Sequence, residues 1–167
     1  MTTSSKLNSD QNNAFEAIKL FIKHKTSDTF ILKGYAGTGK TFLMQYLATW
    51  LNDNNQDFKL LASTGRAASV LRGKTGFEVK TMHGVVYKFN SVKGDYENIP
   101  DDAPIDMFGQ MTLQFTLKTP EPKQIVYIVD EASMLSSEIA EKGNFAVFGS
   151  GMLLIDCLLY TSDAADE

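Results

Sequence analysis

The 167-residue sequence lacks the features that mark secreted, metal-thiolate and membrane proteins. Its single cysteine, Cys157, excludes an internal disulfide and a metal site built from several cysteines. No apolar run is long enough to span a bilayer, and the N-terminus lacks the apolar stretch of a signal peptide. The net charge of −4 argues against an overall basic nucleic-acid binder, although a local basic groove needs only a few side chains. These absences predict a cytoplasmic protein without a membrane partner.

Glycine, by contrast, is concentrated in Gly34–Thr41, which reads G-Y-A-G-T-G-K-T. The apolar run at 29–32 is predicted to be a buried strand, and residues 42–48 are predicted to be a helix with one apolar side. A glycine-rich turn between a strand and a helix is the context of a P-loop, whose backbone N–H groups surround phosphate oxygens. Lys40 is expected to reach the β- and γ-phosphates and to be catalytic, and the Thr41 hydroxyl is expected to hold Mg²⁺. The predicted nucleotide-binding residues of this stretch are Gly34, Tyr35, Ala36, Gly37, Thr38, Gly39, Lys40 and Thr41.

An acidic pair, Asp130 and Glu131, follows a continuous apolar run at 125–129. Such a run suits the centre of a parallel sheet, where the end of the strand lies beside the phosphates. Asp130 is then expected to hold Mg²⁺ and Glu131 to orient or deprotonate the attacking water, as a catalytic residue. The alternative is a solvated acidic loop after a strand.

Three further positions have two interpretations each. Gln11 follows Ser9, the expected N-cap of the first helix, and either reads the adenine edge with its amide or is an ordinary exposed glutamine. Ser63 and Thr64 follow an expected strand at 58–62, and form either an anion site or a simple cap for the helix after them. His83 has no partner cluster that suggests a metal, and a lone histidine is more often a structural hydrogen-bonder.

The remaining pattern predicts an α/β P-loop NTPase domain. A mostly parallel sheet would carry helices on both faces. Residues 90–119 are rich in turn residues and contain an alternating stretch at 111–118, which is typical of a half-exposed strand. This part is therefore expected to be a small β-containing insertion that stands off the main sheet.

Five segments together resemble the RecD/Dda-like branch of superfamily 1 DNA helicases. They correspond to its Q motif and motifs I, Ia, Ib and II, in the order Leu7–Gln11, Gly34–Thr41, Ala62–Ala68, Thr81–Gly84 and Val129–Leu135. An ordered set of motifs is more specific than a P-loop alone. The resemblance implies a motor that uses ATP and Mg²⁺ to move along single-stranded DNA and to separate duplexes.

The resemblance also assigns roles to individual residues. It implies that Gln11 contacts adenine and that Ser63, Thr64 and His83 lie along the DNA strand. It further implies that the segment from about 87 to 122 is an inserted subdomain with a strand-separating pin. The aromatic candidates for this pin are Phe89, Tyr96, Phe108 and Phe115.

The resemblance stops after the second acidic motif. The family continues with motif III and a second RecA-like domain that supplies an arginine finger. The arginines of this chain are Arg66 and Arg72, and neither matches the arginine finger. Residues 157–167 resemble a translated sequencing adapter, with a genuine acidic tail as the alternative. We therefore expect 1–156 to be an N-terminal RecA-like ATPase domain, present as a fragment, whose partners are single-stranded DNA and the second RecA-like domain of the same protein.

Two other functions fit parts of the sequence. One is a catalytically incomplete module that binds nucleotide or DNA without doing mechanical work. The other is a P-loop kinase for a small molecule, although a kinase gives no role to the segments Glu131–Ser133 and Ala62–Ala68. A helicase domain accounts for more of the motifs than either alternative.

Overall fold

The computed structural model describes residues 7–24, 27–93, 112–121, 124–138 and 146–162. Its helices are α1 (Ser9–His24), α2 (Lys40–Asp53), α3 (Gly65–Thr75), α4 (Met82–Val86), α5 (Leu153–Ser162) and the 3₁₀ helix η1 (Ala132–Met134). Its strands are β1 (Phe58–Ala62), β2 (Val79–Thr81), β3 (Tyr87–Lys93), β4 (Thr112–Leu117), β5 (Val126–Val129) and β6 (Ala146–Phe148). The strands form two separate three-stranded sheets, which we call sheet A and sheet B.

Sheet A is parallel throughout and has the strand order β2-β1-β5. The side chains of β1 alternate between two cores, because successive residues of a strand point to opposite faces. Leu60 and Ala62 pack with residues of α1, α2 and α3, whereas Leu61 packs with residues of α4 and α5. The predicted parallel sheet with helices on both faces is thereby confirmed.

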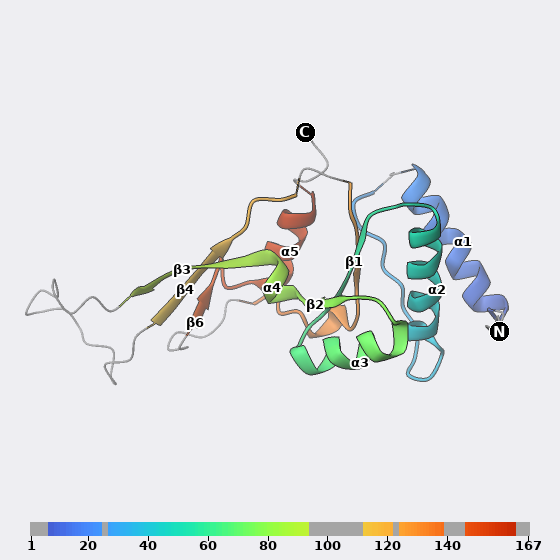
Figure 1. Cartoon of the computed structure of the whole chain (residues 1–167), viewed down its shortest axis with the longest axis horizontal. Coiled ribbons are helices and arrows are strands. Elements are labelled where there is room, and N and C mark those ends of the chain that lie inside the picture. The colour runs from blue at the N-terminus through green and yellow to red at the C-terminus, as the bar shows by residue number, and fades with distance from the viewer. Residues whose placement is uncertain (1–6, 25–26, 94–111, 122–123, 139–145, 163–167) are drawn as a thin grey trace, which may run out of the picture.

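Sheet B has the order β3-β4-β6 and extends away from α1, α2 and α3 (Figure 1). Strands β3 and β4 are antiparallel, and β6 adds to β4 in parallel. The strand predicted at 111–118 is confirmed as β4. Strand β6 comes from outside the predicted insertion at about 87–122, and the pin candidates Tyr96 and Phe108 lie outside the described residues.

One predicted strand is absent, and another does not have the predicted position in the sheet. Residues 29–32 form no strand, and Ile31 is 72% exposed. In the described chain no strand pairs with this segment, and an apolar run without a neighbour cannot satisfy its backbone groups as a strand. The strand predicted at 125–129 is confirmed as β5, but among the described strands it is an edge of sheet A instead of its centre, and only Ile128 of its residues is buried.

Helix α5 crosses the predicted domain boundary after residue 156. Asp156 is fully buried and accepts hydrogen bonds from the Tyr87 hydroxyl at 2.7 Å and the Ser150 N–H at 3.0 Å. Cys157 and Tyr160 are each 4% exposed in the core shared with α4. The origin of residues 157–167 stays a prediction. Among the described helices, none has the length and apolar character that crossing a membrane requires.

Candidate functional site

The glycine-rich turn depends on two glycines with left-handed backbone. Gly37 and Gly39 have φ of +80° and +84°, a region that side chains with a Cβ rarely enter. A Cβ on Gly39 would also lie 2.4 Å from the Nε2 of Gln11. The turn therefore requires glycine at Gly39 both for its conformation and for the approach of α1.

Lys40 closes this turn on itself. Its Nζ donates to the carbonyl oxygens of Gly34 and Tyr35, both at 2.8 Å. Gly39, the N-cap of α2, provides no side-chain cap, so the first N–H groups of this 14-residue helix have no capping side chain. These features are those of a polyphosphate-binding site. The glycines allow the tight turn, the start of α2 has uncapped N–H groups, and Lys40 supplies a positive charge beside them. On binding, Lys40 would exchange two neutral acceptors for charged oxygens, which accept stronger hydrogen bonds.

Gln11 lies against the P-loop through a reciprocal helix cap. Its backbone N–H donates to Asn8 Oδ1 at 2.8 Å, and its Oε1 accepts from the Asn8 N–H at 3.1 Å. Its Nε2 donates to the Thr38 carbonyl at 3.2 Å. Asn8, and not Ser9 as predicted, therefore caps α1, because its amide oxygen reaches the N–H three residues on. Gln11 is placed beside the nucleotide turn. To hydrogen-bond to adenine, its side-chain amide must release its bonds to the Asn8 N–H and the Thr38 carbonyl.

The acidic pair follows directly from β5. Asp130 donates its N–H to the Leu61 carbonyl at 2.9 Å, which fixes it beside the end of β1. Its Oδ1 accepts the Glu131 N–H at 3.0 Å. Glu131 has a left-handed backbone with φ of +52°, and its side chain is exposed. A non-glycine residue in this region is uncommon and occurs at functional turns.

The described residues contain no hydrogen bond or ion pair between the P-loop and this acidic pair. They also contain no cluster of three or more His, Cys, Asp or Glu side chains that could hold a metal alone. Thr41 and Asp130 offer hard oxygen ligands of the kind Mg²⁺ prefers, and Mg²⁺ commonly completes its shell with water and phosphate oxygens. A Mg²⁺ bound by either residue would therefore need further ligands, such as water and the phosphate oxygens of a nucleotide.

The predicted DNA contacts lie at the carboxyl edge of sheet A. Thr64 caps α3 by accepting the Ala67 N–H at 3.2 Å, so the simple-cap interpretation holds for Thr64. The Ser63 hydroxyl approaches Met134 Sδ of η1 at 3.7 Å. Parallel pairing aligns Ala62 with Thr81, so the turn after β1 and helix α4 leave the same edge. In Figure 1 the P-loop turn, the start of α3 and η1 also lie along one edge of the molecule.

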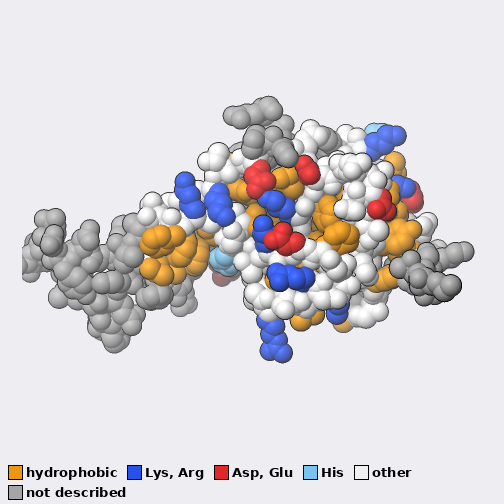
Figure 2. All heavy atoms as spheres, viewed as in Figure 1, with side chains coloured by type: hydrophobic (Ala, Val, Ile, Leu, Met, Phe, Trp, Pro, Cys, Tyr) orange, Lys and Arg blue, Asp and Glu red, His pale blue; other side chains and the backbone are white. Residues whose placement is uncertain are grey.

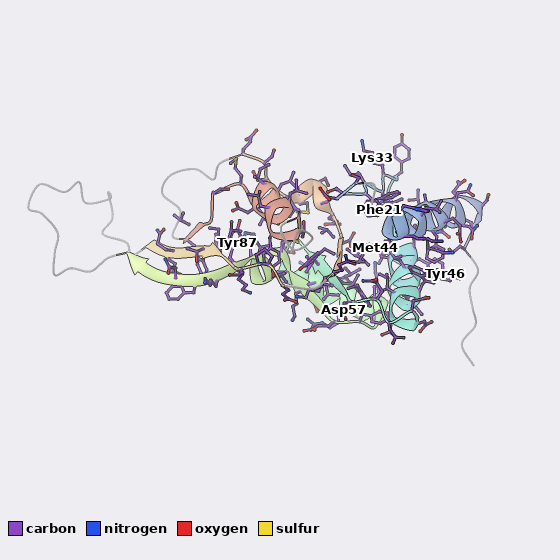
Figure 3. The ribbon with its side chains drawn as sticks, turned by 90° about the horizontal axis from the view of Figure 1, so that it is seen from above. Phe21, Lys33, Met44, Tyr46, Asp57 and Tyr87 are labelled. Carbon is purple, nitrogen blue, oxygen red and sulfur yellow. The ribbon has the colours of Figure 1, made fainter. Side chains whose placement is uncertain are left out.

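His83 lies in α4 among aromatic rings. Its ring centroid is 4.8 Å from that of Phe148 and 5.8 Å from that of Tyr87. Burial lowers the pKa of His83 below its ordinary 6.5, so the imidazole is neutral at pH 7. Tyr87 lies where sheet B meets the rest of the chain (Figure 3). Any ligand that reached His83 would therefore meet a neutral imidazole and not a cation.

Sequence reasoning missed two residues near the site. Asn8 has a signal, since an N-cap residue three positions before a glutamine is a capping-box pattern. Lys74 has no such signal in the sequence, because it lies at the end of α3, far along the chain from the P-loop. It lines a cleft of about 340 Å³ together with Thr41, Phe42 and Gln45, next to the start of α2.

A family model described as an AAA domain matches residues 6–142, which is most of the chain. The chain belongs to this AAA domain family. The family consists of P-loop NTPases and contains RecD-like helicase domains, and its members generally use a nucleotide and Mg²⁺. Membership confirms the predicted α/β P-loop fold and places the AAA domain among nucleotide-binding proteins. No curated protein and no solved structure matches the chain.

Proposed function

We propose that this AAA domain hydrolyses ATP and couples hydrolysis to movement along single-stranded DNA, as the N-terminal ATPase domain of a RecD/Dda-like helicase. One observation carries the proposal. Parallel pairing of β2, β1 and β5 directs the segments after Ala62, Thr81 and Val129 to the same edge of sheet A. In the proposed mechanism, a nucleotide-dependent movement of one of these segments would have only a short path to the other two.

Each predicted residue has a role in this proposal. Lys40 neutralises charge on the transferred phosphoryl group, while Thr41 and Asp130 supply oxygen ligands for Mg²⁺. Glu131 orients the attacking water and accepts its proton. Gln11 selects adenine, and Ser63, Thr64 and His83 contact the DNA strand through hydrogen bonds that do not depend on sequence.

A complete catalytic cleft needs a further positive group. The Arg72 guanidinium donates to the Val79 carbonyl at 3.0 Å and thereby fixes α3 against β2, so it is committed to the fold. We propose that a second RecA-like domain of the same protein supplies the arginine that stabilises the transition state, a group worth roughly 10³–10⁵ in rate. The chain alone would then turn over ATP slowly.

A binding module without turnover is the second candidate. It is favoured by the absence, among described residues, of any hydrogen bond or ion pair between the P-loop and the acidic pair. In this case the domain would bind nucleotide or DNA, and Glu131 would have no effect on either.

Phosphate release with and without single-stranded DNA tests the proposal, with Glu131→Gln as the variant. The exposed Glu138→Gln is a matched control because Glu138 lies beyond η1 on the same connection. We expect DNA to stimulate hydrolysis and Glu131→Gln to abolish turnover while nucleotide binding remains. Equal turnover by wild type and Glu131→Gln would remove the catalytic assignment and favour the binding module. Hydrolysis that does not respond to DNA would contradict the coupling.

A further inference from the structure

The cleft beside the P-loop joins two helices that are distant in the sequence. It has a volume of about 340 Å³ and is lined by Thr41, Phe42, Gln45 and Lys74. The first three residues lie at the start of α2, whereas Lys74 lies in the last turn of α3. Among the described residues that line the cleft, Lys74 is the charged one. The cleft therefore places a cation of α3 close to the P-loop threonine that is expected to hold Mg²⁺.

The end of α3 is held in place on both sides of Lys74. Thr75 is buried, and its hydroxyl donates to the Leu71 carbonyl at 2.9 Å. Gly76 ends the helix and donates its N–H to the Arg72 carbonyl, also at 2.9 Å. The Arg72 guanidinium is itself bonded to strand β2. Because the backbone at Lys74 is ordered in advance, less conformational freedom is lost when its side chain contacts a ligand.

The Lys74 ammonium group is accessible and has no acceptor in the described part of the chain. Lys74 is exposed, and its side chain makes no hydrogen bond or ion pair with another described residue. Helix α3 contains no acidic residue, so no carboxylate of its own helix competes with an anionic ligand. Figure 2 shows lysine or arginine side chains at the lower edge of the molecule, where α3 lies in Figure 1. The surface along α3 therefore suits an anion.

A lysine in the last turn of a helix also has a purely structural explanation. Its charge interacts favourably with the partial negative charge of the helix C-terminus. Lys23 occupies the same place in α1, whose first turn, and not its last, contacts the P-loop. The helix dipole accounts for a lysine at either helix end, but it does not account for the position of Lys74 in a cleft with Thr41. Comparing Lys74 with Lys23 therefore separates the two explanations by experiment.

We propose that Lys74 donates a hydrogen bond to a phosphate oxygen of the bound nucleotide, as a second cation beside Lys40. The inference rests on the nucleotide binding in the proposed function and adds a residue from another helix. Charged oxygens accept stronger hydrogen bonds than neutral ones, and lysine is a common phosphate ligand. Helix α3 begins directly after Thr64, a predicted DNA contact, and is about 16 Å long. A nucleotide held by Lys74 thus contacts the helix whose other end carries that residue.

The test measures the Kd of the full chain for ATP with Mg²⁺ by calorimetry. Lys74→Met keeps most of the length of the side chain and removes its charge, and we expect it to raise the Kd roughly fivefold or more. Lys74→Arg should stay within about twofold of wild type, because arginine also donates to phosphate. Lys23→Met is the matched control, since Lys23 is an exposed lysine in the last turn of a helix. It should leave the Kd unchanged.

Protection of the lysine from acetylation supplies an independent readout. With ATP and Mg²⁺ present, acetylation of Lys74 should slow, and that of Lys23 should not, as followed by mass spectrometry of peptides. ATP binding by wild type with an unchanged Kd in Lys74→Met would overturn the inference and leave the nucleotide site intact. An equal rise of the Kd in Lys74→Met and Lys23→Met would also overturn it, because the loss would then reflect charge in general. Absence of ATP binding by wild type would overturn both the inference and the proposed function.

Discussion

The two sheets use hydrophobic residues for different purposes. In sheet A the central strand β1 buries Leu60, Leu61 and Ala62 on both faces, and polar chemistry lies only after the strands end. In sheet B the contacting rings of Phe89, Phe115 and Phe148 are half-buried at Phe148 and Phe115 and 55% exposed at Phe89. Sheet A is therefore a scaffold whose edge positions a site, whereas sheet B offers its own face as a surface. Substitutions that act on one sheet should leave the function of the other unchanged.

The reactivity of Cys157 tests whether α5 belongs to the junction between the sheets. Burial, with a smaller contribution from Asp156, raises the pKa of the Cys157 thiol to about 12 from an ordinary 9.0. The thiolate fraction at pH 8 should then fall roughly a thousandfold, and alkylation of the native protein should be slower than that of the unfolded protein by a similar factor. Equal labelling rates in buffer and in urea would show that α5 does not pack there.

Leu61→Ala should cause the largest loss of stability, because Leu61 is almost fully buried between sheet A and α4. We expect a fall of about 2–5 kcal/mol in the free energy of unfolding, measured by urea denaturation. Phe89→Ala should cost much less, since more than half of that side chain is exposed. Similar losses for the two variants would contradict the division between scaffold and surface.

Lys40→Ala should reduce ATP hydrolysis by about 10²–10³-fold, the usual effect of removing one group that stabilises developing charge. Lys33→Ala is the matched control, because Lys33 lies exposed on the segment that leads into the turn (Figure 3). The affinity for single-stranded DNA without nucleotide should not change in either variant. Undiminished hydrolysis by Lys40→Ala would refute the nucleotide site.

Thr64→Ala should destabilise the fold by about 1 kcal/mol, because it removes the oxygen that caps α3. Ser63→Ala should cost little, since the Ser63 hydroxyl makes only a long contact to a sulfur atom. If both residues also touch DNA, both variants should weaken DNA binding in a salt-dependent assay. A stability loss without any change in DNA affinity would leave Thr64 with a capping role only.

His83 should make stability depend on pH. Its pKa is lowered in the folded state by burial, so the unfolded chain binds the proton more readily as the pH falls through 6.5. Above pH 6.5 the protonation of His83 does not lower the free energy of unfolding. Below pH 6.5 that free energy decreases with falling pH, until the pH reaches the lowered pKa of His83 in the folded state. His83→Gln should remove this dependence, whereas His24→Gln should not, because His24 is exposed at the end of α1. Identical profiles for wild type and His83→Gln would contradict a half-buried, neutral His83.

Sequence reasoning succeeded where a local pattern determines structure. The strand at 58–62 was predicted with the bounds that β1 has, and the helix predicted after the P-loop is part of α2. It failed where strand formation depends on a neighbouring strand. The apolar runs at 29–32 and 125–129 look alike, but of the two only 125–129 has a strand paired with it. An isolated run carries no information about which strand will lie beside it.

The difference between local patterns and distant contacts also explains which functional residues the sequence predicted and which it missed. The P-loop and the acidic pair were predicted because their residues are consecutive. Phe89 and Phe115 were named as aromatic candidates, but their contact with each other and with Phe148 was not predicted, since the three residues come from three strands and meet only through the register of sheet B. Contacts between distant segments require the pairing to be known.

The coupling between nucleotide and DNA tests the central claim most directly. The affinity for labelled single-stranded DNA would be measured with and without a non-hydrolysable ATP analogue and Mg²⁺, for wild type and Lys40→Ala. Because the segments after β1, β2 and β5 share one edge, we predict that the analogue changes the DNA affinity of wild type by roughly fivefold or more, and that Lys40→Ala removes the change. An equal DNA affinity of wild type with and without the analogue would contradict the account.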